Sequence, residues 1–201
     1  MAGELYYPRN VGMRDAWDRV HTAQKRFNES DFWSDREPFK ALRNCFACAP
    51  DDMMLTPPVY FDYGNRVFFG KNFYANTGLT ILDENTVKFG DNVFLGPHVN
   101  IYTACHPIDA QIRNTKIQYA KPVEIGSNVW IGGGVIINPG VTIGDEVVIG
   151  SGSVVVHNIP SYSVAAGNPC KVIRQLTEED HLFWKRKYDE YINYKEQESL
   201  K

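Results

Sequence analysis

The sequence predicts a mainly β protein, a parallel β-helix with a helical segment before it and a helix after it. Three observations predict this: a six-residue period through the centre, helical spacing of apolar residues near the start, and an amphipathic pattern at the end. The expected boundaries are 1–56 for an N-terminal helical segment that caps the coil, 57–174 for the β-helix with a protruding loop at 103–122, and 175–201 for a C-terminal helix.

The six-residue period is clearest from Val123, where the chain reads VEIGSN, VWIGGG, VIINPG, VTIGDE, VVIGSG and SVVVHN. Every unit has an aliphatic residue in its third place, and glycine follows that residue in four of the six units. The same phase runs upstream through units opened by Val67, Phe73, Leu79, Val87, Val93 and Val99. A phase held through twelve units disfavours the alternative of ordinary strands with chance Ile-Gly pairs.

Such a period predicts a coil if each unit is one short strand and a turn. Three units then close one triangular coil, and residues one coil apart stack at strand spacing. The third-place aliphatics are expected to point inward, with glycine at the corners where side chains would interfere. Asn138-Pro139-Gly140 is a strong turn signal at one corner.

The two flanks lack the repeat and are expected to be helical. Trp17, Val20 and Phe27 lie near helical spacing, and the segment REPFKALRNCFAC suggests a second helix. Thr177 followed by Asp180 resembles a capping box with Asp in place of Glu or Gln, and after it charged residues are interleaved with aromatic ones, which indicates an amphipathic helix. Both helical flanks are expected to cap the solenoid, and the aromatic stripe to pack against the coil or a neighbouring subunit.

Composition excludes several classes of protein. The 201 residues carry a net charge of −3, which gives no basic footprint for nucleic acid. No run approaches the roughly 20 apolar residues that span a bilayer, and no signal peptide opens the chain. A cytoplasmic protein without a membrane partner is expected, with free thiols at Cys45, Cys48, Cys105 and Cys170.

The candidate for chemistry is His106, which lies near the start of the longest interruption of the repeat. Long insertions extend from one face of a solenoid, often the binding face. Histidine is suited to general base catalysis because its unperturbed pKa is near 6.5. The alternative is that His106 only orders the loop.

Several stretches resemble the maltose and galactoside O-acetyltransferases of the hexapeptide-repeat superfamily: PPVYFDYG, NFYAN, GDNVFLGPHV, IYTACHPID, GSNVWIGGGVIINPGVTIGD and AAGNPCKVI. YTACHPID followed by RN is more similar to the maltose branch. The resemblance implies a left-handed β-helix, a homotrimer with active sites between subunits, acetyl-CoA as co-substrate and a sugar acceptor. It also implies that His106 is the catalytic base.

The resemblance assigns further residues. Asn76 matches an asparagine that contacts the acceptor, with Tyr74 and Trp130 as candidates for the walls, although packing is an equal alternative for Trp130. The residues expected at coenzyme A are Gly133 and Ser151 on the pantetheine groove, Lys171 and Arg174 near the phosphates, and Val156 and His157 where relatives commonly have Thr-Lys.

The sequence departs from the galactoside enzymes at positions that bear on acceptor specificity. Pro8 stands where the galactoside enzymes have an acceptor-contacting aspartate, and Asp62 and Glu84 also fall where those enzymes differ, which disfavours a galactoside acceptor. Glu124 is a weak candidate for orienting His106. No metal is expected, because Cys45 and Cys48 lack a second pair for zinc.

Other readings keep the fold and change the function. The acceptor could be an antibiotic, an amino sugar or serine. A γ-type carbonic anhydrase would need three zinc-binding histidines across an interface, and the five histidines do not show that pattern. A non-catalytic scaffold would not need a histidine in its one long loop.

Overall fold

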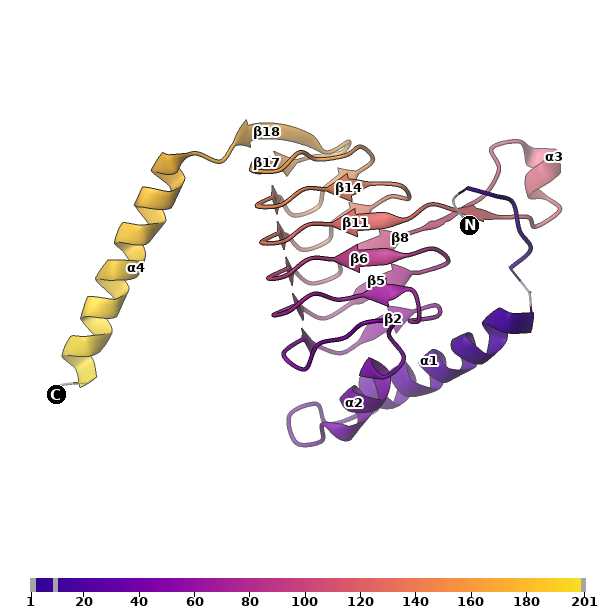
Figure 1. Ribbon diagram of the computed structural model, residues 1–201, viewed down its shortest axis with the longest axis horizontal. Helices are drawn as coiled ribbons and strands as arrows, with labels where there is room; N and C mark the ends of the chain where they lie inside the picture. Colours follow the sequence, from indigo (N-terminus) through magenta and orange to yellow (C-terminus); the bar gives the residue numbers. More distant parts are fainter. Residues whose placement is uncertain (1–2, 9–10, 200–201) are drawn as a thin grey trace.

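The computed structural model describes residues 3–8 and 11–199, and it is a parallel β-helix of stacked triangular coils (Figure 1). The seven-stranded sheet contains β1 (Met54–Leu55), β4 (Tyr74–Ala75), β7 (Phe94–Leu95), β12 (Trp130–Ile131), β15 (Val148–Ile149), β17 (Ser163–Ala166) and β18 (Lys171–Gln175). The five-stranded sheet contains β2 (Val59–Phe61), β5 (Leu79–Leu82), β8 (Asn100–Tyr102), β13 (Ile136–Ile137) and β16 (Val154–Val155). The four-stranded sheet contains β3 (Val67–Phe68), β6 (Val87–Phe89), β11 (Val123–Ile125) and β14 (Thr142–Ile143).

The stacking follows the six-residue period, which confirms the predicted β-helix. Ile131 pairs in register with Leu95 below it and Ile149 above it, and all three side chains are buried. The valine that opens each unit also points inward, which was not predicted: Val129 and Val135 are at most 1% exposed. Alternate residues of a strand face opposite sides, so the first and third places share the core and the second place faces out.

One corner of the coil carries a ladder of polar side chains. The amides of Asn72, Asn92 and Asn128 each donate to the side chain one coil above, ending at Glu146, over 2.8–2.9 Å. These four residues have left-handed backbones, with φ between 52° and 58°. Asparagine tolerates that conformation better than most residues, so the ladder closes each corner without glycine.

The N-terminal helices α1 (Val11–Glu29) and α2 (Glu37–Arg43) cover the first coil. Val20 and Phe27 of α1 are fully buried. The Gln24 side chain accepts the N–H of Phe61 at 2.8 Å, and Asn28 exchanges two hydrogen bonds with Val59. These amides pair with the exposed edge of β2, which would otherwise offer its backbone to another chain.

The C-terminal end of the solenoid is covered by a strand, where the sequence predicted that the C-terminal helix would cap it. β18 pairs antiparallel with β17 and covers the last coil, whereas α4 (Glu178–Ser199) projects away from the solenoid (Figure 1). Its aromatic side chains are exposed, Trp184 by 67%, so α4 does not cap its own coil. The predicted capping contact is present, since the Asp180 carboxylate accepts the N–H of Thr177 at 2.9 Å.

None of the described helices combines the length and the apolar character needed to cross a bilayer.

Candidate functional site

His106 lies at the root of an arm that leaves the coil between β8 and β11. The arm begins with β9 (Ala104–Cys105), turns through α3 (Ala110–Arg113) and returns as β10 (Tyr119–Ala120) (Figure 1). β9 and β10 pair antiparallel, with Cys105 opposite Tyr119. Arg113 donates to the carbonyl oxygens of Pro107 and Ile108, which braces the turn. The pairing continues outward to place Gln118 beside His106.

Both ring nitrogens of His106 have partners. Nδ1 lies 3.3 Å from the carbonyl oxygen of Ile117, and Nε2 lies 3.3 Å from Nε2 of Gln118. A carbonyl oxygen can only accept, so the proton of the neutral ring is on Nδ1 and donates to Ile117. Nε2 then carries the lone pair and accepts the Gln118 N–H. This tautomer is the one that a base acting through Nε2 requires.

An N-terminal segment lies along the arm and completes a hollow beside the imidazole. Tyr6 and Gln118 exchange backbone hydrogen bonds of 2.8 and 2.9 Å. The hollow has a volume of about 610 Å³. Its lining consists of Tyr7, Pro8, His106, Arg113, Thr115, Lys116 and Gln118. Besides His106 and Arg113, four lining side chains can form hydrogen bonds, those of Tyr7, Thr115, Lys116 and Gln118, so the hollow suits a small hydroxylated molecule.

Asn76, Gly133 and Ser151 lie together at a different corner, between the seven-stranded and five-stranded sheets. Asn76 follows β4, and its side-chain oxygen accepts the N–H of Thr77 at 2.7 Å. A Cβ on Gly133 would lie 3.1 Å from Pro97. One on neighbouring Gly132 would lie 2.6 Å from the backbone nitrogen of Ser151. Glycine therefore allows the coils to approach closely at this corner.

Tyr74 and Trp130 lie on the outer face of the seven-stranded sheet. Tyr74 pairs in register with Phe94, and Phe94 with Trp130. Met54 extends the column downward and is paired with Tyr74. Trp130 is 58% exposed and Phe94 is 41% exposed. The column is thus an apolar strip along one face of the coil, which is unusual for a surface that stays in water.

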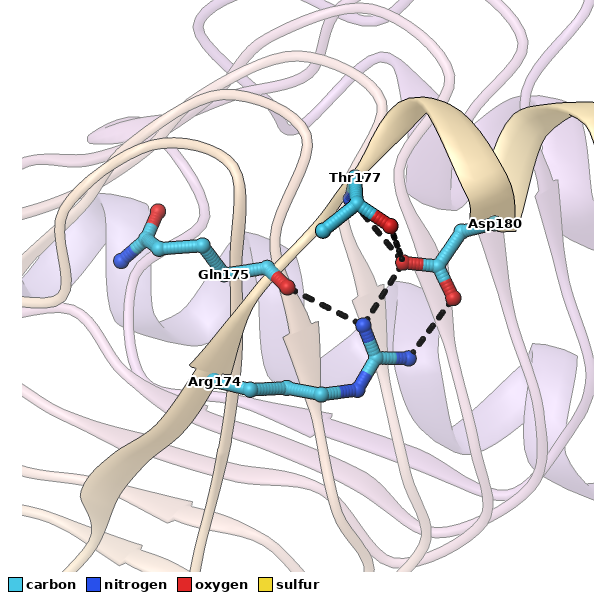
Figure 2. A network of polar contacts seen from close by, with 4 residues as sticks. All are labelled: Arg174, Gln175, Thr177 and Asp180. Atoms are coloured by element: carbon cyan, nitrogen blue, oxygen red, sulfur yellow. Dashed lines mark hydrogen bonds and ion pairs between the residues drawn. The ribbon is translucent and has the colours of Figure 1, made fainter.

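Val156 and His157 follow β16 and are both exposed, and Lys171 opens β18 with its side chain exposed. Arg174 is engaged. Its guanidinium donates two hydrogen bonds to Asp180, over 2.7 and 2.9 Å, and one to the carbonyl oxygen of Gln175 (Figure 2). The pair of Arg174 and Asp180 links β18 to α4. A phosphate bound at Arg174 would therefore have to share the guanidinium with the Asp180 carboxylate.

Within one chain, the structure does not gather the predicted site residues into one cavity. His106 lies at the corner between the five-stranded and four-stranded sheets, one sheet away from Asn76, Gly133 and Ser151. None of those three lines the hollow at His106. Glu124 pairs with Lys88 at 3.6 Å, and the ring nitrogens of His106 contact Ile117 and Gln118, so the structure does not support the weak prediction that Glu124 orients His106.

Three acidic side chains gather behind the arm. The Asp83 carboxylate is fully buried and accepts the N–H groups of Asp62 and Tyr63 through one oxygen. Burial raises its pKa to about 6. Burial and the neighbouring charge of Asp62 raise the pKa of Glu84 to about 8. Among the described residues, Tyr6 Oη, Asp83 Oδ2 and Glu84 Oε2 are buried oxygens without a hydrogen-bond partner.

Replacing Glu84 with glutamine is expected to make stability less dependent on pH. The ordinary pKa of 4.5 rises to about 8 on folding, so the folded state holds a proton that the unfolded state has released. Wild-type stability should therefore fall as pH rises from about 4.5 to about 8, and stay low above that. Glutamine removes this loss, on the order of 1–2 kcal/mol after discounting solvent exposure. Urea unfolding of both proteins at about pH 5 and about pH 8.5 tests this prediction. If the unfolding free energy changed equally between the two pH values in both proteins, the raised pKa of Glu84 would be contradicted.

Sequence reasoning missed Gln118 and Tyr6. The available signal was the length of the interruption: a loop that leaves and rejoins one corner must return antiparallel, which puts a residue just before the repeat resumes opposite His106. Among the described residues, no group of three or more His, Cys, Asp or Glu side chains could hold a metal ion.

Comparisons with known proteins identify the family to which the chain belongs. Residues 122–157 match the family model described as "Bacterial transferase hexapeptide (six repeats)". The galactoside O-acetyltransferase of Escherichia coli K12 is 41% identical over 93% of this chain and 92% of its own. A galactoside acetyltransferase solved with coenzyme A superposes with a TM-score of 0.86, at 42% identity, over 89% of this chain and 90% of that one.

A maltose O-acetyltransferase from Clostridium difficile 630 gives a TM-score of 0.84 at 44% identity, over 87% of this chain and 94% of that one. The chain therefore belongs to the family of galactoside and maltose O-acetyltransferases, and it is an acetyltransferase.

Proposed function

We propose that this enzyme transfers the acetyl group of acetyl-CoA to a hydroxyl of a small sugar, with His106 as general base. The observation that carries the proposal is the position of His106: its Nδ1 lies 3.3 Å from the carbonyl oxygen of Ile117, and its ring lines a hollow of about 610 Å³. A histidine fixed in this way can accept the proton of a hydroxyl that binds in the hollow.

The proposed reaction is a direct transfer. The acceptor hydroxyl gives its proton to Nε2 while its oxygen attacks the thioester carbonyl carbon, which forms the new C–O bond. The tetrahedral intermediate then collapses, the C–S bond breaks, and the thiolate of coenzyme A takes the proton from the imidazolium. The Nδ1–H bond to Ile117 holds the ring in place through both steps. No metal is assigned a role.

The donor site is proposed at the other corner. The thin pantetheine arm would lie beside Gly133, which has no side chain, and the exposed Ser151, and exposed Lys171 would pair with phosphate. His157 and Val156 would lie near the same ligand. Asn76, Tyr74 and Trp130 would then form the acceptor side of the cleft.

Because the donor and base residues lie at different corners of one chain, we propose that the active site forms between subunits of a homotrimer. The exposed apolar column of Met54, Tyr74, Phe94 and Trp130 supports this, since a neighbouring subunit would cover it. Light scattering should give three times the chain mass of 22.9 kDa; a monomer that is fully active would refute the shared site. A cytoplasmic location is proposed because the described cysteines are free thiols.

Acetyl-CoA-dependent thiol release with a panel of acceptors tests the function. Maltose, glucose and a galactoside represent the sugars, and glucosamine, serine and an aminoglycoside represent the alternatives. Release driven best by a sugar, with the product acetylated on oxygen by mass spectrometry, is the expected result. Release driven by the amines alone would change the acceptor class, and no release with any acceptor would favour a scaffold.

A further inference from the structure

The hollow beside His106 is lined by two cations, Arg113 and Lys116, and by no carboxylate. Neither cation forms an ion pair within the part of the chain that the structure describes. Glu4 on the N-terminal segment and Asp109 on the arm are outside the lining, as are the three acidic side chains behind the arm. The hollow therefore presents positive charge that the described chain leaves without a partner.

The turn that follows α3 holds both cations in place. Nη1 of Arg113 donates to the carbonyl oxygens of Pro107 and Ile108, over 3.1 and 2.8 Å. The backbone N–H of Lys116 donates to the carbonyl oxygen of Arg113 at 2.9 Å. A guanidinium has five N–H donors, and the described chain uses only those of Nη1, so the donors of Nε and Nη2 stay available for a ligand. A cation whose position is already fixed loses little freedom when an anion binds.

The size and the chemistry of the hollow favour an acceptor that has both hydroxyl groups and a negative charge. Its volume of about 610 Å³ lies within the range of small-ligand pockets, and it can hold a sugar ring together with an anionic substituent. Arginine binds carboxylates and phosphates through two parallel hydrogen bonds, and lysine binds them as a point charge. A neutral sugar would fill the same space and leave both charges without a counter-ion other than dissolved salt.

We infer that Arg113 and Lys116 form an anion subsite, and that the preferred acceptor is a sugar that carries a phosphate or a carboxylate in addition to the hydroxyl that is acetylated. The anionic group takes no part in the transfer. It positions the sugar while His106 takes the proton of the reacting hydroxyl. This inference rests on the proposed function and narrows its substrate class.

The test compares acceptors that differ only at the anomeric carbon. They are the methyl glycoside, the 1-phosphate and the carboxymethyl glycoside of the best sugar in the panel, which are neutral, a phosphate and a carboxylate. The wild type should use at least one anionic acceptor with a kcat/KM about tenfold above that of the methyl glycoside, and the better of the two identifies the group. Equal kcat/KM for all three would overturn the inference and leave the proposed function standing. Absence of transfer to every sugar, charged or neutral, would remove the proposed function and this inference with it.

The variants ask whether the charge of Lys116 causes the preference. Lys116→Asn removes that charge, and asparagine tolerates the left-handed backbone at this position, where φ is 68°. It should lower the preference by about threefold or more, through a higher KM for the anionic acceptor. Lys116→Arg keeps the charge and should keep the preference. So should Lys71→Asn, the same substitution at an exposed residue outside the hollow.

Two results with these variants would contradict the subsite. If Lys116→Asn kept the preference of the wild type, the charge of Lys116 would not act on the acceptor. If Lys116→Asn weakened the binding of acetyl-CoA in a calorimetric titration and left the preference unchanged, the cation would serve the donor. Either result overturns the inference and leaves the general base and the sugar acceptor in place.

Ionic strength gives a second readout, because Arg113 and Lys116 are both exposed. The preference of the wild type for the anionic acceptor should shrink as salt is raised from about 0.01 M to about 0.5 M, since the screening length falls from about 30 Å to below about 10 Å. The kcat/KM of the methyl glycoside should not follow this trend. A preference that salt leaves unchanged would show that shape selects the acceptor, which also overturns the inference.

Discussion

Replacing His106 with alanine should reduce acetyl transfer by 10²–10⁴-fold, the range that general base catalysis contributes. The reason is geometric: the His106 imidazole lines the hollow, and its Nδ1 lies 3.3 Å from the carbonyl oxygen of Ile117. Affinity for acetyl-CoA should change little, because the residues proposed to bind it do not include His106. Single-turnover thiol release and calorimetric titration with acetyl-CoA separate the two effects.

The matched control is His181→Ala, the same substitution on exposed α4. It should retain wild-type kcat/KM. If His106→Ala kept more than about a tenth of the activity, below the range expected of a general base, the imidazole would only order the arm. If it lost acetyl-CoA binding as well, the two corners would be coupled more closely than the single chain suggests.

The repeat made most of the coil predictable, because a β-helix is stabilised by contacts between neighbouring coils. Ile125, Ile131 and Ile137 are buried where the period places them. The period also located the interruption that contains His106. Each of these features depends on residues at a fixed spacing, which a single sequence displays directly.

The surroundings of His106 could not be predicted in the same way. Gln118 contacts the imidazole from an irregular arm, and Tyr6 pairs with the backbone of Gln118 from the N-terminal segment; no period describes either segment. The same holds for Arg174, whose charge suggested a phosphate ligand and whose guanidinium is paired with Asp180. A sequence shows that a charge is present, but the partner of that charge depends on how the chain turns.

For the helix α4, the sequence pattern predicted the helix correctly, and it left two partners open for the aromatic stripe, the coil or a neighbouring subunit. Its alternation of charged and aromatic residues predicted a helix, and the helix forms. Among the described residues its large aromatic side chains are exposed and the helix projects away from the coil, where β18 already covers that end (Figure 1). An amphipathic pattern shows that a face can be buried, and the topology decides whether the same chain buries it.

Phe69→Ala should cause the largest loss of stability, about 3–5 kcal/mol. The ring of Phe69 is 2% exposed and lies at the centre of a cluster, with ring centroids 5.0 Å from Phe46, 4.6 Å from Phe73 and 5.3 Å from Phe89. Alanine would leave a cavity between the N-terminal segment and the first coils. The graded control Phe69→Leu keeps most of the volume and should cost less, about 1.5 kcal/mol.

The loss should also be local, because coils of a solenoid stabilise mainly their neighbours. Hydrogen exchange of Phe69→Ala should accelerate in α1, β2 and β3 while β13 and β16, several coils away, keep their protection. Loss of protection throughout the coil would mean that the β-helix unfolds as one unit. A loss of unfolding free energy below about 1 kcal/mol would mean that the neighbouring rings move in to fill the cavity, so that Phe46 packs directly against Phe89 of β6.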